Sequence, residues 1–198
     1  DDEIEKFSSN GTFLLRFGSN GTGDGNFDGP HDVAVDSKGN IYVCDDGNNR
    51  IQKFDKNGNF LRKWGETGTL EEQTESPSSI AIDKYDRIFV SDDDDDLIQV
   101  YDSNGKFLYA WGGTGLYKDG KFGDPYHIYC DDAGYIYVID DDRDDIQKFT
   151  PEGKHIATIG TDDFAKLADG SLGGIAVFGE YIYITKWSAP IIIKFKQQ

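Results

Sequence analysis

Short apolar runs alternate with polar turns along the whole chain, and the runs recur at a nearly fixed spacing. The segment IQKFDKNGNFLRKWG at 51–65 returns as IQVYDSNGKFLYAWG at 98–112 and as IQKFTPEGKHIATIG at 146–160. An earlier copy, IEKFSSNGTFLLRFG, occupies 4–18, and a shortened copy, IIKFKQQ, occupies 192–198. Successive copies begin 46 to 48 residues apart. A period in this range is typical of a β-propeller or a solenoid.

One repeat contains four predicted strands. Residues 30–65 contain the β-branched or aromatic runs VAVD, IYV, IQKF and NFLRKW, separated by turn signals. Asn57-Gly58 suits a tight hairpin because both residues accept positive φ angles. The third and fourth runs thus form the outer hairpin of a four-stranded antiparallel meander. Strands that are apolar at successive positions indicate that both sheet faces are covered, as in stacked propeller blades, and a β-solenoid is the alternative.

The pattern predicts an all-β protein, a β-propeller built from four-stranded antiparallel blades. We treat residues 1–198 as one propeller domain or a segment of one. Its parts are an outer hairpin of a split blade at 4–18, blades at 30–65, 77–112 and 125–160, and a last, incomplete blade at 173–198.

The blade signature resembles the NHL-repeat family. The matching residues are Gly29-Pro30-His31, Val33-Ala34-Val35-Asp36, Gly39-Asn40-Ile41-Tyr42-Val43, Asp45, Asn48-Asn49-Arg50-Ile51-Gln52 and Trp64-Gly65. The resemblance implies a six-bladed ring, of which this chain would be a segment. A closed smaller ring stays open as the alternative, with the strands at 4–7 and 191–196 competing for one position. Function is not implied, because the fold carries unrelated activities, among them RNA binding, ligand sensing and a metal-dependent lyase.

The composition narrows the range of partners. The chain has 37 acidic and 20 basic residues, a net charge of −17 and a pI near 4.4. Such a surface repels phosphate groups, so we expect no nucleic acid as a partner, and RNA binding is disfavoured. No apolar run is long enough for a membrane helix, so we expect no direct membrane insertion. A cationic partner, metal ions or a salty environment would suit this charge.

The loops that join the second and third strands should share one face with the linkers between blades, and we expect any chemistry there. Two of these loops are strongly acidic, SDDDDDL at 91–97 and IDDDRDD at 139–145. Adjacent carboxylates repel unless a cation neutralises them, and calcium prefers oxygen ligands. The runs therefore predict a calcium site, and the alternative is a solvated acidic rim without a specific ion. The candidate ligands are Asp92, Asp94, Asp96, Asp140, Asp142 and Asp144.

The ends of these loops differ between blades. Asp45 and Arg50 are placed to pair across the first loop, whereas Leu97 and Asp145 take the position of the arginine later. We therefore expect the pairing to be lost in the later blades. The family resemblance implies that the first aspartate of each loop binds the backbone.

Two histidines, His31 and His127, lie where first strands enter the central channel. A pair of imidazoles there could hold zinc. A catalytic zinc needs three protein ligands, however, and His155 falls in an outer strand. Packing of two polar residues at strand ends is the alternative.

We expect a non-catalytic scaffold that binds a protein or glycan partner through its loop face, stabilised by calcium and located in an extracellular or periplasmic space. The predicted contact residues are Tyr117, Phe122, Tyr126 and Trp187, and Asn10 and Asn20 are N-glycosylation acceptors in sequons. The alternative function is a metal-dependent lyase or lactonase-like enzyme with its site at the central channel. Assembly with other chains would complete a ring.

Overall fold

The computed structural model describes the chain except for residues 1, 66–72, 117, 161–171, 187–191 and 197–198. In the described part every regular element is a β-strand, apart from the short 3-10 helix η1 (Asp46–Asn48). None of these residues forms a helix that could cross a membrane.

The strands form five antiparallel sheets, in which each strand pairs with its neighbours along the chain. The first hairpin contains β1 (Ile4–Phe7) and β2 (Phe13–Phe17). Blade 1 contains β3 (Pro30–Val35), β4 (Ile41–Asp45), β5 (Arg50–Phe54) and β6 (Phe60–Gly65). Blade 2 contains β7 (Pro77–Ile82), β8 (Ile88–Asp92), β9 (Leu97–Tyr101) and β10 (Phe107–Gly112). Blade 3 contains β11 (Pro125–Cys130), β12 (Ile136–Asp140), β13 (Asp145–Phe149) and β14 (His155–Ile159). The last blade contains β15 (Leu172–Phe178), β16 (Tyr181–Lys186) and β17 (Ile192–Lys196).

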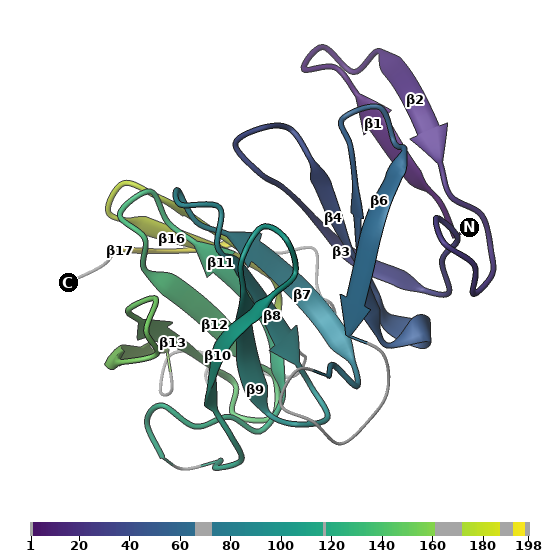
Figure 1. Ribbon diagram of the computed structural model, residues 1–198. Coiled ribbons are helices and arrows are strands. Elements are labelled where there is room, and N and C mark those ends of the chain that lie inside the picture. The colour runs from purple at the N-terminus through teal and green to yellow at the C-terminus, as the bar shows by residue number, and fades with distance from the viewer. Residues whose placement is uncertain (1, 66–72, 117, 161–171, 187–191, 197–198) are drawn as a thin grey trace.

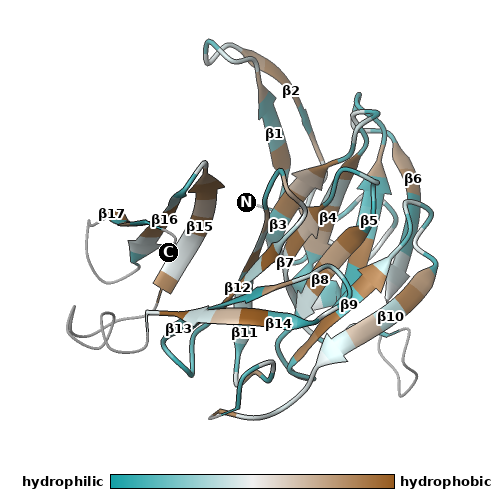
Figure 2. Ribbon diagram, turned by 90° about the vertical axis from the view of Figure 1, so that its left-hand side faces the viewer, coloured by the Kyte–Doolittle hydropathy of each residue, from teal (hydrophilic) through white to brown (hydrophobic). Residues whose placement is uncertain are grey.

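The sheets stack face to face around an axis (Figure 1). The first strand of each blade lies innermost, since β7 contacts both β3 and β11, and β11 contacts β15. The first hairpin and the last blade lie at the two ends of the arc (Figure 2). The predicted all-β propeller of four-stranded antiparallel blades is thereby confirmed. Because β1 pairs with β2 and β17 with β16, the segments that would compete in a closed ring belong to different sheets.

The core lies between the blades, which explains the weak alternation in the sequence. All five residues of β4, β8 and β12 are buried. One cluster joins Tyr42 and Ile51 of blade 1 to Ile88 and Val90 of blade 2. Because side chains on both faces of a blade reach a neighbouring blade, both faces must be apolar.

An aromatic contact repeats at three junctions between sheets. A closing aromatic residue at the end of one sheet packs on an aromatic residue in the third strand of the next. The ring centroids are 4.8 Å apart for Phe17 and Phe54, 5.9 Å for Trp64 and Tyr101, and 4.6 Å for Trp111 and Phe149. Aromatic pairs at such distances stabilise beyond the burial of their area.

A chain of hydrogen bonds connects the innermost strands of blades 1 to 3. The hydroxyl of Ser79 in β7 donates to Oδ2 of Asp32 in β3 over 2.6 Å. The same Asp32 oxygen accepts from the Ile80 N–H over 3.0 Å. The Ser79 oxygen in turn accepts from the Ile128 N–H in β11 over 3.2 Å. One buried hydroxyl therefore links three blades at the axis.

Candidate functional site

The loops between second and third strands lie against the linkers between blades, as the sequence predicted. In blade 1 the Gly47 N–H donates to the Asp28 carbonyl over 2.9 Å, and the Asn48 amide donates to the Gly21 carbonyl over 3.1 Å. In blade 3 the Asp141 N–H donates to the Asp124 carbonyl over 2.9 Å. These loops and linkers together form one face of the propeller, which we call the loop face.

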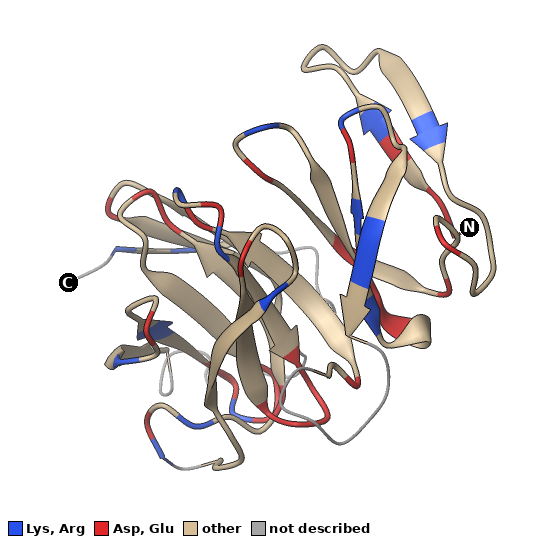
Figure 3. Ribbon diagram, viewed as in Figure 1, with Lys and Arg blue, Asp and Glu red and all other residues tan. Residues whose placement is uncertain are grey.

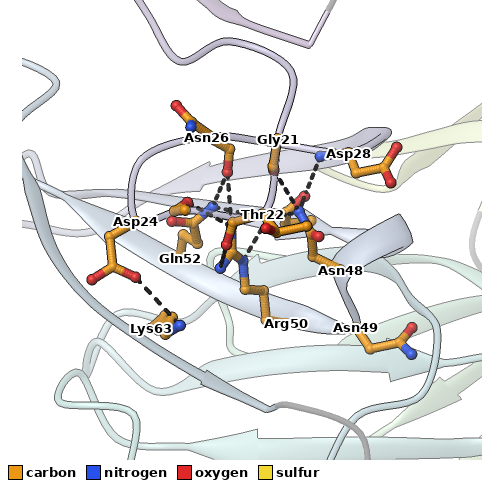
Figure 4. A network of polar contacts seen from close by, with 12 residues as sticks. Gly21, Thr22, Asp24, Asn26, Asp28, Asn48, Asn49, Arg50, Gln52 and Lys63 are labelled. Atoms are coloured by element: carbon orange, nitrogen blue, oxygen red, sulfur yellow. Dashed lines mark hydrogen bonds and ion pairs between the residues drawn. The ribbon is translucent and has the colours of Figure 1, made fainter.

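A buried ion pair anchors the first linker to blade 1 (Figure 4). The Arg50 guanidinium lies 2.7 Å from the fully buried carboxylate of Asp45, which also accepts from the Asp28 N–H over 2.8 Å. The guanidinium further donates to the carbonyls of Thr22, Gly23 and Asn26. These bonds to carbonyls tie β5 to the linker.

Asp92 and Asp140 occupy the position of Asp45 in the next two blades. Asp92 accepts from the Glu75 N–H over 3.2 Å, and Asp140 accepts from the Gly123 N–H over 2.9 Å. The first aspartate of each loop therefore binds the backbone, as expected. Burial is the largest cause that raises the pKa of both Asp92 and Asp140, each to about 6.

The expected loss of the arginine pairing in the later blades is wrong for blade 3. Arg143, which lies inside the loop, pairs with Asp145 at 2.8 Å and with Asp140 at 3.7 Å. It also donates to the carbonyls of Gly115 and Lys118, as Arg50 does to its own linker. An arginine two residues earlier in the loop thus also ties its blade to its own linker. In blade 2 the position of Arg50 is held by Leu97.

The aspartate runs do not form a metal-binding group in the described part of the chain. Asp94, Asp142 and Asp144 are exposed, and Asp92 and Asp140 are occupied by backbone N–H groups. Among the residues that the structure describes, no three His, Cys, Asp or Glu side chains are arranged to hold a metal ion. The calcium site at Asp92, Asp94, Asp96, Asp140, Asp142 and Asp144 therefore stays a prediction, without support from the geometry.

A different set of carboxylates gathers near the axis. Burial raises the pKa of Tyr126, and the charges of four aspartates raise it further. These four, which we call the acidic mouth, are Asp93, Asp124, Asp141 and Asp46. In Figure 3 acidic segments line the lower edge of blades 1 and 2, where the β4–β5 and β8–β9 loops lie. Three of the four stand at the same position, the second aspartate of their loop.

Three carboxylates of the acidic mouth, those of Asp93, Asp124 and Asp141, are poorly compensated among the described residues. Burial, and then the charges of Asp124, Asp46 and Asp92, raise the pKa of Asp93 to about 7, against a 2.6 Å hydrogen bond from Ser78. Burial and the charge of Asp141 also raise the pKa of Asp124. The buried Oδ1 atoms of Asp124 and Asp141 have no hydrogen-bond partner among the described residues. Buried oxygens without donors are costly, so the mouth would gain from a ligand that donates hydrogen bonds.

The rings of both predicted channel histidines lie next to the ring of Tyr126. The ring of exposed His31 lies 5.9 Å from the ring of Tyr126, edge to face, and Tyr126 lies 5.2 Å from the ring of His127. Burial lowers the pKa of His127, while Asp32 raises it and His31 lowers it further. The structure therefore places both histidines near Tyr126 and Asp32.

The structure tests the burial of two of the four predicted contact residues. Phe122 is wrong: it is fully buried and packs 6.0 Å from Trp111 and 5.6 Å from Phe149, measured between ring centroids. Phe122 belongs to the linker and packs its ring into the core of blade 3, as Phe27 does against Phe54 in blade 1. Tyr126 is half-buried at the mouth. Tyr117 and Trp187 lie outside the described residues.

Both sequon asparagines, Asn10 and Asn20, are exposed. Their modification stays a prediction.

The sequence interpretation missed the acidic mouth and Arg143. Alignment of the repeats would have revealed Asp46, Asp93 and Asp141 as equivalent positions. No such signal marks Asp124, which lies in a linker of variable length.

Stacked four-stranded blades around an axis define a β-propeller. The model of the NHL repeat matches residues 27–54, so the chain contains an NHL repeat and the resemblance seen in the sequence is confirmed. No curated protein matches the sequence.

Several solved structures share the fold. A streptogramin B lyase superimposes with a TM-score of 0.69 at 15% identity, covering 100% of this chain and 62% of that one. A virginiamycin B lyase from Staphylococcus aureus gives a TM-score of 0.68 at 15% identity, covering 100% of this chain and 64% of that one. Hydrazine synthase of Kuenenia stuttgartiensis gives 0.61 at 14% identity, covering 79% of this chain and 41% of that one. This chain thus spans less than two thirds of each of these structures, and at such identities the likeness shows the fold alone.

Proposed function

We propose that this protein is a non-catalytic propeller module that binds a cationic segment of a protein partner at the acidic mouth. The observation that carries the proposal is the gathering of four aspartates around Tyr126, with two buried carboxylate oxygens that have no donor among the described residues. A lysine or arginine side chain supplies both the missing positive charge and the missing hydrogen bonds.

The surroundings of the mouth favour a cation over a neutral ligand. The rings of Tyr126 and His31 meet edge to face beside the carboxylates, and aromatic faces attract ammonium and guanidinium groups. The net charge of −17 attracts cations over a longer range and speeds their encounter with the face. Because the pKa of Asp93 is raised to about 7, binding of a cation near neutral pH should release a proton from it.

A titration with a short peptide rich in Lys and Arg tests the proposal. We expect binding by calorimetry at low salt, weakened by Asp124→Asn and by Asp141→Asn, with proton release that depends on the buffer. Asp132→Asn is the matched control, because Asp132 is an exposed aspartate on the β11–β12 turn. Equal affinity in all four proteins would mean that the peptide responds only to net charge, and the proposal would fail.

An extracellular or periplasmic location belongs to the same proposal, supported by the exposure of both sequons. Secretion of the chain from a glycosylating host, followed by glycosidase treatment, tests it. Loss of mass after treatment is expected, and the Asn10→Gln and Asn20→Gln variants should each lose part of that shift.

A second candidate function is an enzyme with its site at the channel. The observation in its favour is the grouping of His31, Tyr126 and His127, where the lowered pKa of His127 makes a neutral imidazole available as a base. A panel of lactones and cyclic esters tests it. Turnover that is lost in His127→Ala and kept in Asp132→Asn would favour the enzyme over the binding module.

A further inference from the structure

The outer hairpins share one kind of turn, and most of them carry an asparagine before the turn glycine. The pairs are Asn10-Gly11, Asn57-Gly58 and Asn104-Gly105, whereas blade 3 has Glu152-Gly153. All four turns close in the same way, because the glycine N–H donates to the carbonyl three residues earlier over 2.9 or 3.0 Å. The three asparagines can therefore be compared by what surrounds their side chains.

An asparagine that precedes a glycine can lose its side-chain amide without an enzyme. The glycine nitrogen gives up its proton, attacks the side-chain carbonyl carbon and expels the amide nitrogen, which leaves as ammonia. The succinimide ring that forms then adds one water molecule and opens to aspartate or to isoaspartate, in which the main chain runs through the side-chain carbon. Glycine permits the attack because it has no Cβ to obstruct it. Each Asn-Gly turn therefore holds both reacting groups.

The side chain of Asn104 is free to take part in this reaction, whereas that of Asn10 is held. Oδ1 of Asn10 accepts from the Ser8 hydroxyl over 2.6 Å, and from the hydroxyl and the N–H of Thr12 over 2.9 and 3.2 Å. These three bonds restrain the rotation that the attack requires. The side chains of Asn57 and Asn104 are exposed and have no hydrogen-bond partner among the described residues.

A cation beside Asn104 favours the first step of the reaction. The Arg62 guanidinium donates to the Asn104 carbonyl, which belongs to the same peptide group as the Gly105 nitrogen. A positive charge at a peptide group stabilises the anion that remains when the nitrogen has lost its proton. Both the free side chain and the charge therefore favour reaction at Asn104.

Asn104 also stands between two residues that are fixed to blade 1. The Ser103 carbonyl accepts from the Lys53 ammonium over 2.6 Å. On the other side, Gly105 lies so close to Trp64 that an added Cβ would come within 2.5 Å of the ring. Isoaspartate adds one carbon atom to the main chain between these two contacts. The turn cannot lengthen there and keep both contacts in place.

We propose that Asn104 is a site of spontaneous deamidation, and that its isoaspartate product loosens the junction between blades 1 and 2. The modification needs only water and a base, and it is slower at Asn10 because of the hydrogen bonds to that side chain. Asn57 is a second site of the same kind, since its side chain is equally free. The amount of product then increases with the age of the folded protein.

Peptide mapping of the folded protein during incubation in mildly alkaline buffer tests the proposal. The chain is produced in a bacterial host that adds no glycan, so that Asn10 is unmodified at the start. We expect aspartate and isoaspartate to accumulate several times faster at Asn104 and Asn57 than at Asn10. Equal rates at Asn10 and Asn104, or no product at Asn104, would overturn the proposal.

The variant Asn104→Glu tests the effect on the junction. It copies Glu152 of blade 3, whose turn closes with the same hydrogen bond and has no side-chain amide to lose. The thermal midpoint of the unaltered chain should fall during incubation, and that of Asn104→Glu should fall less. Asn10→Glu is the matched control, because it makes the same change in an equivalent turn, and it should age as the unaltered chain does. An equal fall in Asn104→Glu would contradict the loosening of the junction.

Hydrogen exchange of aged, unaltered protein gives a readout that does not depend on how the variants fold. The amides of residues 102–106 should lose protection as isoaspartate accumulates at Asn104. Unchanged protection in the modified fraction would refute the effect on the junction.

Discussion

Replacing Arg50 by leucine, the residue that blade 2 has at this position, should destabilise the protein because it breaks a buried ion pair. The Arg50 side chain is 4% exposed and pairs at 2.7 Å with the Asp45 carboxylate, which is fully buried. The substitution leaves that carboxylate without its counter-charge. It also removes the donors to the Thr22, Gly23 and Asn26 carbonyls.

The expected loss at pH 8 is about 3–5 kcal/mol, the usual cost of breaking a buried ion pair by removing one partner. Part of this loss comes from the carbonyls of Thr22 and Gly23, which lose the guanidinium as a donor, whereas the Asn26 carbonyl keeps the Gln52 amide.

Urea unfolding at pH 8 measures this loss, with Asp45→Asn and the double variant completing a cycle. The double variant should be more stable than Arg50→Leu alone, because it no longer buries a charge. A double variant no more stable than the single one would refute the reasoning.

Three further outcomes are expected. The pKa of Asp93 is raised to about 7 in the folded protein, so the folded state binds this proton more tightly than the unfolded state does. The resulting stabilisation is fully present below the pKa of the unfolded state and is lost as pH rises through about 7. Asp93→Asn should therefore flatten the fall in thermal midpoint between about pH 4 and pH 8, and an unchanged slope would contradict this. Gly105→Ala should cost about 2–4 kcal/mol in urea unfolding, because φ is +73° and a Cβ would overlap the Trp64 ring. Gly11→Ala, with φ of +82° and open space, should cost only about 1 kcal/mol, and equal costs would show that the ring contact is unimportant. Calcium and sodium chloride at equal ionic strength should raise the melting midpoint equally, and a larger rise with calcium would indicate a specific site.

The fold could be predicted because each blade repeats the same local chemistry. The apolar second strand and the turn glycine recur at a nearly constant spacing in every complete blade, so each repeat supports the assignment of the others. Blade 3 departs from the pattern only in detail, with Glu152 before the turn glycine and Ile159 in place of the closing aromatic residue. Phe122 was misassigned because it lies in a linker, where an aromatic residue suggests an exposed contact. It stands three residues before a proline, as Phe27 does, and this shared position indicates a side chain that is buried in the core.

The site was harder to predict because it depends on distances between different blades. The runs of aspartate around Asp94 and Asp142 stand out in the sequence, but both of these residues point into solvent. The carboxylates that gather near Tyr126 come from three loops and one linker, and only the curvature of the arc brings them together. Arg143 was overlooked for another reason. It lies two residues before the position that corresponds to Arg50, so comparison of the repeats does not mark it as an equivalent arginine.

The hydroxyl of Ser79 makes the blades depend on more than their nearest neighbours. In a simple stack of repeats, each unit interacts only with the adjacent ones, and the stack can unfold from an end one unit at a time. Ser79 donates to Asp32 of blade 1 while accepting from Ile128 of blade 3, so loss of blade 1 changes the bonding of a group that blade 3 also uses. We therefore expect blades 1 to 3 to unfold more cooperatively than independent repeats would.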